Sequence, residues 1–471
     1  MTAPRQPNLL FLCSDQHRAD IMPGAGNRSV QAPNLARLAG QSFAFRHAYC
    51  TQPLCTPSRG CLLTGLWPQH HGAQDNVRPL RADVRTLAEF LPADYATAYF
   101  GKWHLGNEIF AQHGFREWRS IEDQYRAYYG AGFDRNRRSD YHHFLLRQGY
   151  PPDRSGEPGE PGEFSRPFAA GLPEPLSKAA FLAGEAERFL ARADRDQPFM
   201  LTVSMLEPHP PTFGPLNQLY DPATLPVGAA FARPVGPDDS RHHQRRCELV
   251  AREGYKHHPL NTEADWRRVR ANYYGLVTQV DHAVGRILAA LESSGQAANT
   301  IVVYTSDHGD MLGDHALMQK GVFYEQATRV PLLLRIPWLT PPTAAIEAPF
   351  SQIDLMPTLL ELLGRGVPAG LDGKSWADRL PRASEIRGDD IFVIWNDAKH
   401  PGEESRCIVT PDRWKCIFYH DDAPVLFDLT TDPDELRNLA RLPGHAPRLQ
   451  GYADKVRRWQ QSVGDSLTLI F

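Results

Sequence analysis

The stretch NLLFLCSD, residues 8–15, indicates the fold more directly than any other part of the sequence. Its five apolar residues, Leu9 to Cys13, run without interruption and are followed by Ser14 and Asp15. A short apolar run that ends in polar residues is typical of a strand buried on both faces. We therefore predict a fully buried strand over residues 8–15, with its polar end at the edge of a sheet.

The rest of the chain alternates between extended and helical patterns. We predict further strands in ATAYFGKWH (96–104), PFMLTVSMLEPH (198–209), TIVVYTSDHGD (300–310) and VPLLLRIP (330–337). We predict helices in PNLARLAG (33–40), TLAEFL (86–91), KAAFLAGEAERFLARAD (178–194), residues 263–293 and DLMPTLLELLG (354–364). Strands that alternate with helices predict an α/β fold, with a large, mostly parallel sheet flanked by helices.

Two long insertions and one change of pattern divide the chain. Residues 107–175, which contain RSGEPGEPGEF, and residues 210–261, which contain DDSRHHQRR, are predicted to be irregular. From about residue 387 short apolar segments replace the alternation, and a helix is expected over residues 447–463. We predict an α/β domain over residues 1–386 and a small C-terminal α+β domain over residues 387–471, with an antiparallel sheet plus one helix.

The composition argues against several classes of protein. The 471 residues are 42% hydrophobic and 23% charged, as in ordinary globular proteins. A net charge of −4 gives no overall field that favours nucleic acid or an anionic membrane. The longest apolar run near the start, LLFLC, is too short for a membrane span or a signal peptide, so we expect a cytoplasmic protein. The seven cysteines are irregularly spaced and form no CxxC pair, which argues against a disulfide framework or a structural zinc site.

Polar residues follow two of the predicted strands. Asp15 and Gln16 follow the first strand, and Asp307 and His308 follow the strand in TIVVYTSDHGD. Ligands of open α/β sheets gather beyond the carboxyl ends of the strands, so these four side chains are expected to converge. Two carboxylates, an amide oxygen and an imidazole would bind a divalent cation, and Ca²⁺ or Mg²⁺ is favoured over Zn²⁺. The alternative is that each aspartate only caps the loop after its strand.

Basic side chains accompany these candidate metal ligands. Lys102 and His104 alternate in GKWHLG and so share one side of an extended segment, while His209 lies in EPHPP and Lys320 in MQKG. Together with Arg59 they could form a cationic bowl, which a tetrahedral oxyanion ester needs beside a metal. Taken singly, each would be an ordinary solvated or hydrogen-bonded side chain.

The segment LCTPSRGCLLTG, residues 54–65, adds a candidate nucleophile. Pro57 and Ser58 suit the first positions of a helix, and the amides at a helix start attract anions. Cys55 lies just before this expected helix start. It is the one cysteine of the seven whose neighbourhood indicates chemistry.

These motifs together resemble the type I (formylglycine-dependent) sulfatase family of the alkaline phosphatase superfamily. CTPSR followed by LLTG, residues 55–65, matches the maturation signature of that family. SDQ, GKWHLG, EPHPP, SDHGDMLGDH and MQKG match its other motifs in order, and LFDLTTDPDELRNLA resembles its C-terminal domain. The resemblance covers nearly the whole chain and is weakest in the two insertions.

The resemblance implies roles for individual residues. Cys55 would be oxidised to formylglycine by a separate maturation enzyme, and the hydrated aldehyde would attack sulfur. His104 would be the base that acts on this diol, and Arg59 would orient it. The remaining roles implied are sulfate binding by Lys102, His209 and Lys320, protonation of the alcohol by His209 or Lys320, and metal ligation by Asp15, Gln16, Asp307 and His308.

The implied metal is one divalent ion, with Ca²⁺ expected first. Many sulfatases carry an aspartate where this chain has Gln16 and an asparagine where it has His308. The set in this chain also resembles choline sulfatases and the phosphonate monoester hydrolase/phosphodiesterase branch. Loss of a carboxylate makes the site less negative, so Mn²⁺ and Mg²⁺ are alternatives.

The predicted function is hydrolysis of a sulfate monoester to alcohol and sulfate. A phosphonate monoester or phosphodiester hydrolase that uses the same formylglycine is the first alternative, and a non-catalytic binding protein is the second. Trp103 and the two insertions predict a narrow pocket, which favours the monoester.

The substrate is open between a sulfated sugar and a small alkyl or aryl sulfate. Candidate selectivity residues are Asp75, Asn76, residues 241–246 and residues 395–397, although a charged loop is usually only a solvated face. The expected partners are this small substrate and the maturation enzyme, with no nucleic acid and no membrane. Assembly into a homo-oligomer is left open.

Overall fold

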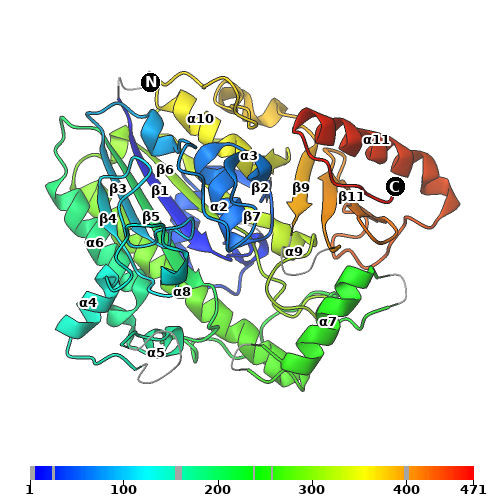
Figure 1. Cartoon of the computed structure of the whole chain (residues 1–471), viewed down its shortest axis with the longest axis horizontal. Helices are drawn as coiled ribbons and strands as arrows, with labels where there is room; N and C mark the ends of the chain where they lie inside the picture. Colours follow the sequence, from blue (N-terminus) through cyan, green and yellow to red (C-terminus); the bar gives the residue numbers. More distant parts are fainter. Residues whose placement is uncertain (1–5, 24–26, 154–161, 237–238, 256–257, 397–401) are drawn as a thin grey trace.

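A sheet of eight strands forms the centre of the molecule (Figure 1). The computed structural model describes residues 6–23, 27–153, 162–236, 239–255, 258–396 and 402–471. The strand order is β4-β3-β5-β1-β6-β7-β2-β8. The bounds are β1 (Asn8–Asp15), β2 (Phe43–Tyr49), β3 (Ala96–Gly101), β4 (Glu117–Arg119), β5 (Phe199–Pro208), β6 (Thr300–Ser306), β7 (Arg329–Arg335) and β8 (Phe350–Ser351). Only β7 runs antiparallel to its neighbours β6 and β2, so the predicted mostly parallel sheet is confirmed.

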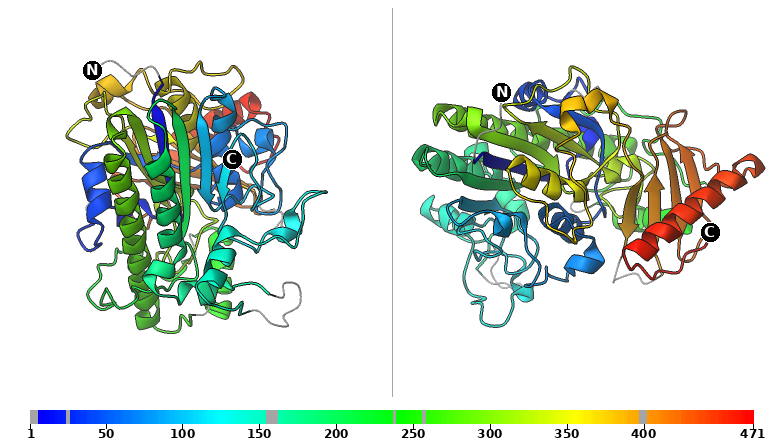
Figure 2. Two further views of the ribbon diagram at one scale, coloured as in Figure 1. Left: turned by 90° about the vertical axis from the view of Figure 1, so that its left-hand side faces the viewer. Right: turned by 90° about the horizontal axis from the view of Figure 1, so that it is seen from above.

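Helices cover both faces of this sheet (Figure 2). The helices α1 (Pro33–Ala39), α6 (Lys178–Arg192) and α8 (Glu263–Ser293) pack on one face, and α2 (Cys55–Thr64) and α10 (Leu355–Leu362) pack on the other. Alternate residues of β1 belong to the two cores, with Leu10 and Leu12 on the α8 side and Leu9 and Phe11 on the α2 side. Burial on both faces explains the uninterrupted apolar run of this strand.

A second, antiparallel sheet of four strands follows in the order β12-β11-β10-β9. Its bounds are β9 (Ile391–Trp395), β10 (Ser405–Val409), β11 (Trp414–Tyr419) and β12 (Val425–Asp428), and α11 (Ala446–Ser462) covers one face. The other face packs on the segment around Phe323 of the larger part. The predicted small antiparallel sheet with one helix is therefore confirmed, while the division at residue 386 stays a prediction.

The two insertions are more regular than predicted. The first contains α4 (Asp140–Arg147) and α5 (Arg166–Ala170), and the second contains α7 (Arg241–Glu253). The Ser240 hydroxyl caps α7 by accepting the N–H of His243 at 3.2 Å, so the expectation of an irregular loop there is wrong. TLAEFL forms a 3₁₀ helix (Leu87–Phe90) instead of an α-helix, and most of RSGEPGEPGEF lies outside the described residues.

All seven cysteines are buried and free. Within the described part of the chain, no helix is both long enough and apolar enough to cross a membrane.

Candidate active site

The carboxyl ends of β1 and β6 carry the four predicted metal ligands. β1 pairs in parallel with β6 and places Ser14 opposite Ser306, so Asp15 and Asp307 leave the sheet side by side. The backbone N–H of Gln16, which has a φ of 70°, donates to Asp307 Oδ1 at 2.9 Å. Neighbouring strand ends therefore bring the side chains of Asp15, Asp307 and His308 together, as predicted.

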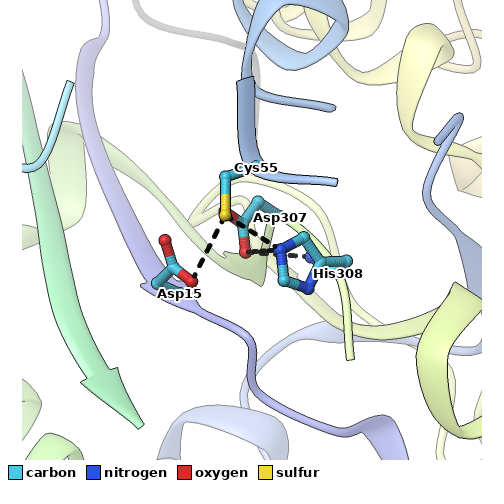
Figure 3. Close-up of side chains that lie close together, drawn as sticks. All are labelled: Asp15, Cys55, Asp307 and His308. Carbon is cyan, nitrogen blue, oxygen red and sulfur yellow. Dashed lines mark hydrogen bonds and ion pairs between the residues drawn. The ribbon is translucent and has the colours of Figure 1, made fainter. Parts of the chain in front are cut away.

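Cys55 is the first residue of α2 and faces this edge of the sheet (Figure 3). The helix begins two residues before Pro57, so the prediction that Cys55 precedes the helix is corrected. The Cys55 Sγ atom lies 3.2 Å from His308 Nε2 and 4.0 Å from Asp15 Oδ1. At the first position of a helix, a negatively charged atom on residue 55 is favoured by the helix dipole.

Four side chains form a buried cluster that fits a divalent cation. One ligand atom from each of Asp15, Cys55, Asp307 and His308 lies within 4.8 Å of the other three. His308 Nδ1 lies 2.9 Å from the Gly309 carbonyl oxygen, and a proton on Nδ1 leaves the Nε2 lone pair facing the cluster. An imidazole whose second nitrogen is held by a carbonyl is the usual form of a metal-binding histidine.

Arg59, one turn after Cys55 on α2, bridges the carboxylates of Asp15 and Asp307. Its Nη2 donates to Asp15 Oδ2 and its Nε donates to Asp307 Oδ2, both at 2.9 Å. Its Nη1 donates to the Lys102 carbonyl at 2.9 Å and to Ser204 Oγ at 2.8 Å. The guanidinium thereby ties the helix to the four adjacent strands β3, β5, β1 and β6 and compensates the buried negative charge.

Lys102 and His104 follow β3; Lys102 contacts the same cluster, and His104 lines the pocket that leads to it. Lys102 Nζ donates to Asp15 Oδ2 at 2.7 Å and lies 3.9 Å from Cys55 Sγ. His104 has a φ of 55°, and its ring stacks on Tyr125 with centroids 4.1 Å apart. Both residues are buried, so the charge of Lys102 acts in a medium of low polarity.

Lys320 and Gln16 are bonded to each other. Lys320 Nζ donates to Gln16 Oε1 at 2.5 Å, and Gln16 Nε2 donates to the Asp310 carboxylate. The amide oxygen predicted as a metal ligand therefore already accepts one hydrogen bond, and its second lone pair remains for a cation. His209 lies nearby, with Nδ1 2.7 Å from the Pro210 carbonyl oxygen.

The electrostatic environment separates Cys55 from the other thiols. Burial and the Asp15 carboxylate oppose ionisation of Cys55, but Lys102, Lys320 and His308 outweigh them and lower its pKa to about 7. Burial raises the pKa of Cys13 to about 12. The thiol at the head of α2 is thus in a cationic environment.

The two pocket histidines are kept neutral. Burial, with Lys102 as the second cause, holds the pKa values of His104 and His209 well below the ordinary range. Burial would raise the pKa of Asp15, but Lys102, His209 and Arg59 hold it well below its usual value. Near neutral pH the site therefore combines a carboxylate with neutral imidazoles that can accept protons.

An open pocket of about 440 Å³ leads from the surface to Cys55. His104, His209 and Lys320 line it together with Cys55. Asp15, Gln16, Arg59, Lys102, Asp307 and His308 are joined to these four by the contacts above. All ten predicted site residues thus meet in one connected network.

The predicted selectivity residues divide into two groups. Asp75, Asn76, Arg246 and Trp395 line the pocket. Arg241 contacts Asp422, and Arg245 contacts Glu403 and Asp421, on the outer side of α7. Asp397 lies outside the described residues.

The predicted wall residue Trp103 does not line the pocket. Its side chain is fully buried and packs against Tyr99, Phe115 and Trp118 in the core. It points away because Lys102 and His104 on either side of it point to the site, as alternation requires. Trp103 therefore gives no reason to expect a narrow pocket.

Several residues at the site were not predicted. Tyr125 and Arg166, from the first insertion, line the pocket, and Arg166 donates to the Tyr125 hydroxyl at 2.8 Å. Ser204 supports Arg59, and Asp310 holds Gln16. The motif SDHGD could have indicated Asp310, whereas nothing in the sequence around Tyr125 distinguishes it.

Two family models match the chain. The model described as Sulfatase matches residues 7–365, and the model described as N-sulphoglucosamine sulphohydrolase, C-terminal, matches residues 313–461. The first match includes every residue of the network described above.

Relatives of known description cover nearly the full chain. The multifunctional alkaline phosphatase superfamily protein PehA of Trinickia caryophylli is 30% identical over 97% of this chain and 96% of that protein. An arylsulfatase of Clostridium perfringens is 29% identical over 94% of this chain and 92% of that protein. The crystal structure of a phosphonate monoester hydrolase of Agrobacterium radiobacter matches with a TM-score of 0.79 and 25% identity, covering 97% and 96% of the two chains.

Proposed function

This chain belongs to the sulfatase family of sulfuric ester hydrolases, and from that premise we propose that it hydrolyses a sulfate monoester through a formylglycine made from Cys55. The observation that carries the proposal is the position of Cys55. Cys55 is the first residue of α2, and its Sγ atom is the fourth ligand atom of the cluster that fits a divalent cation. The residue also lines the open pocket. The sulfur atom lies where an oxygen of a hydrated formylglycine would lie.

The proposed reaction uses residue 55 twice. Formylglycine supplies a hydrated aldehyde with two hydroxyl groups, one for attack on sulfur and one for the release of sulfate. Lys102, next to residue 55, holds a sulfate oxygen. His104 accepts a proton from residue 55, because its lowered pKa keeps its ring neutral near pH 7.

The leaving alcohol needs a proton donor on the pocket side. His209 and Lys320 both line the pocket. Burial lowers the pKa of His209, so its ring is neutral near pH 7 and donates a proton poorly. We therefore assign this role to the ammonium group of Lys320.

A divalent cation, when bound, lowers the pKa of a neighbouring hydroxyl group and stabilises charge on oxygen. Asp15, Asp307 and His308 would hold it, with Gln16 Oε1 beside them. Ca²⁺ is proposed, with Mn²⁺ or Mg²⁺ as alternatives because the site has two carboxylates and one imidazole. The proposal requires a separate maturation enzyme that oxidises Cys55, and a small sulfated molecule as the substrate.

Hydrolysis of a phosphonate monoester or a phosphodiester is the second candidate. The similarity to the phosphonate monoester hydrolase of Agrobacterium radiobacter favours it, and so does the pocket of about 440 Å³, which leaves room for a second organic arm. A sulfate monoester has three non-bridging oxygens and a phosphodiester has two. Lys102 and Lys320 supply cationic hydrogen-bond donors to the sulfate oxygens.

Parallel kinetics test the choice between the two reactions. With one aryl leaving group and saturating metal, we expect kcat/KM for the sulfate to exceed that for the phosphonate or diester by about tenfold or more, or ~1.4 kcal/mol. Aldehyde-specific labelling with peptide mass spectrometry should find formylglycine at residue 55 and a thiol at Cys61. Full turnover by protein with only a thiol at residue 55 would falsify the mechanism, and a preference for the diester would select the second candidate.

A further inference from the structure

Glu108 is a buried carboxylate to which the proposed reaction gives no role. Glu108 lies in the loop after β3, and the residue is 1% exposed. Oε1 accepts the backbone N–H of Trp103 at 2.8 Å, and Oε2 accepts that of His104 at 2.6 Å. The Glu108 carbonyl accepts the indole N–H of Trp118 at 3.1 Å, which fixes the position of the residue itself.

The segment that carries Lys102 and His104 is held at its carbonyl groups by other residues. The Lys102 carbonyl accepts from Arg59 Nη1 at 2.9 Å and from the Tyr99 hydroxyl at 2.7 Å. The His104 carbonyl accepts from Thr56 Oγ1 at 2.8 Å. The N–H groups of residues 103 and 104 point the other way, to Glu108.

His104 needs such support because of its backbone conformation. Its φ of 55° lies in the left-handed region, which is unfavourable for a residue with a side chain. Such a conformation persists only where surrounding contacts determine it. Two charge-assisted hydrogen bonds donated to one carboxylate are among the strongest available contacts.

We infer that Glu108 is a positioning residue whose carboxylate, by accepting both N–H groups, holds His104 in the conformation that places its ring in the same pocket as residue 55. This inference rests on the proposed function, in which His104 accepts a proton from residue 55. It adds a requirement from outside the motifs: the base is aimed by a carboxylate that never touches the substrate.

The ionised form of Glu108 is the one that holds the segment. Burial, partly offset by the two N–H groups, raises its pKa to about 7. The titratable groups that face it are Lys102 and Tyr99 on the β3 side, and Glu122 and Tyr129 in the first insertion. Protonation turns one acceptor oxygen into an O–H group, so one of the two N–H groups loses its partner as the pH falls below this pKa.

The variant Glu108→Gln tests the inference, with Asp354→Asn as the matched control. Glutamine has nearly the same shape, but only its oxygen can accept, and its NH₂ group would face an N–H group. Asp354 likewise accepts one backbone N–H, from Lys374 at 2.8 Å, and one indole N–H, from Trp376 at 3.2 Å. Burial raises its pKa to about 7 as well, and it lies outside the network around Cys55.

In the proposed reaction His104 takes the proton of the second hydroxyl group of residue 55, the one that expels sulfate, so we expect Glu108→Gln to slow the release half of the reaction. Per formylglycine, kcat should fall by about tenfold or more and KM should fall with it, so that kcat/KM changes by less than about threefold. The rise of kcat with pH through about 7 should disappear in Glu108→Gln and persist in Asp354→Asn. Equal losses of kcat and kcat/KM, or an unchanged pH profile, would overturn the inference.

A second readout does not depend on turnover. Histidine-selective NMR, with the His104 resonance assigned from His104→Ala, should report a changed shift and titration of His104 in Glu108→Gln but not in Asp354→Asn. An unperturbed His104 resonance would overturn the inference even if activity fell. If the unaltered protein hydrolysed no sulfate ester, the proposed function would fail while this measurement still decided the role of Glu108.

Discussion

The guanidinium of Arg59 sets the spacing of the candidate metal ligands. It donates one hydrogen bond to the Oδ2 atom of Asp15 and one to the Oδ2 atom of Asp307, each at a nitrogen–oxygen distance of 2.9 Å. The remaining oxygen of Asp15 faces Cys55, 4.0 Å from Sγ, and that of Asp307 lies 3.8 Å from His308 Nε2. In each carboxylate, one oxygen therefore binds the Arg59 guanidinium, and the other faces the place where a metal ion would bind.

Replacing one anionic ligand by an amide of nearly the same shape should therefore weaken metal binding while the fold of the site is kept. In Asp307→Asn we expect metal affinity to fall by at least about 10–100-fold, since a neutral amide replaces a hard anionic ligand. The metal content of the purified protein, measured by plasma mass spectrometry, should fall together with activity. Chelation should reproduce the loss of activity in the unaltered protein.

Asp281→Asn provides the control for this prediction. Asp281 is also fully buried, but it accepts the N–H of Leu35 at 2.7 Å on the far face of the sheet. Its replacement should lower stability and leave the metal content unchanged. A full complement of metal in Asp307→Asn would contradict the site.

The sequence predicted the residues that carry charge at strand ends and missed those that support them. Asp15 and Asp307 could be found because a polar residue after a buried run is unusual. Glu108 and Tyr125 could not, since their roles depend on how an insertion folds back on β3. The prediction that Trp103 narrows the pocket was wrong. Its neighbours Lys102 and His104 face the site, and because successive side chains alternate, the indole of Trp103 faces the core.

The turn at the end of β3 depends on Gly101, whose φ is 116°. A Cβ atom there would lie 1.9 Å from the Ser204 carbonyl oxygen on β5. That same carbonyl accepts the N–H of Lys102 at 2.9 Å. The close approach of β3 to β5 therefore positions Lys102 at the site.

Gly101→Ala should separate the two strands and displace Lys102. We expect the free energy of unfolding to fall by about 2–3 kcal/mol, from the clash and the positive φ together. We expect kcat/KM to fall by about 100-fold, because a shift of about 1 Å at a binding group has such an effect. Urea unfolding and steady-state kinetics measure both.

Gly184→Ala is the matched control for Gly101→Ala. Gly184 lies inside α6, and a Cβ atom there would meet only Arg286 Nη2, at 3.7 Å. Alanine should raise the free energy of unfolding by about 0.5–1 kcal/mol and leave kcat/KM unchanged. Equal effects at the two positions would show that β3 and β5 adjust to the added methyl group.

Elements with strong periodicity or caps were predictable, and weakly patterned ones were not. α8 (Glu263–Ser293) agrees with its prediction at both ends, helped by a capping box between Thr262 and Asp265. α7 was missed because RHHQRRCELVARE has few apolar residues, although its His243 and Cys247 form a buried i,i+4 pair. TLAEFL has a capping box too, but the proline after it leaves room only for a 3₁₀ turn.

Across the whole molecule, a buried ionic cluster joins the two sheets. Lys415 on β11 is fully buried, and its Nζ lies 2.8 Å from Glu325 Oε1 and 2.8 Å from Glu435 Oε1. Glu325 begins α9 (Glu325–Thr328), five residues after Lys320 of the candidate site. The smaller part also sends Trp395 into the pocket. The position of the small sheet therefore bears on the shape of the site.

Removing the cation of this cluster should weaken the whole molecule in a pH-dependent way. Lys415→Met leaves two buried carboxylates without their shared partner, so we expect the free energy of unfolding to fall by about 3–5 kcal/mol near pH 8. Burial, partly offset by Lys415, raises the pKa of Glu435 to about 7, above its ordinary value. A raised carboxyl pKa means that the folded state binds the proton more tightly, and ionisation of Glu435 destabilises the fold as the pH rises through about 7. The loss in Lys415→Met should therefore shrink when urea unfolding is repeated near pH 6.

The control for Lys415→Met is Lys455→Met, on the surface of the same small unit. Lys455 pairs with Asp390 at 2.9 Å, and both side chains are partly exposed. Because solvent screens such a pair, its loss should lower the free energy of unfolding by about 1 kcal/mol or less. If Lys415→Met proved no worse than Lys455→Met at either pH, the buried cluster would not be what joins the two sheets. The apolar contacts around Phe323 would then have to hold the small sheet in place.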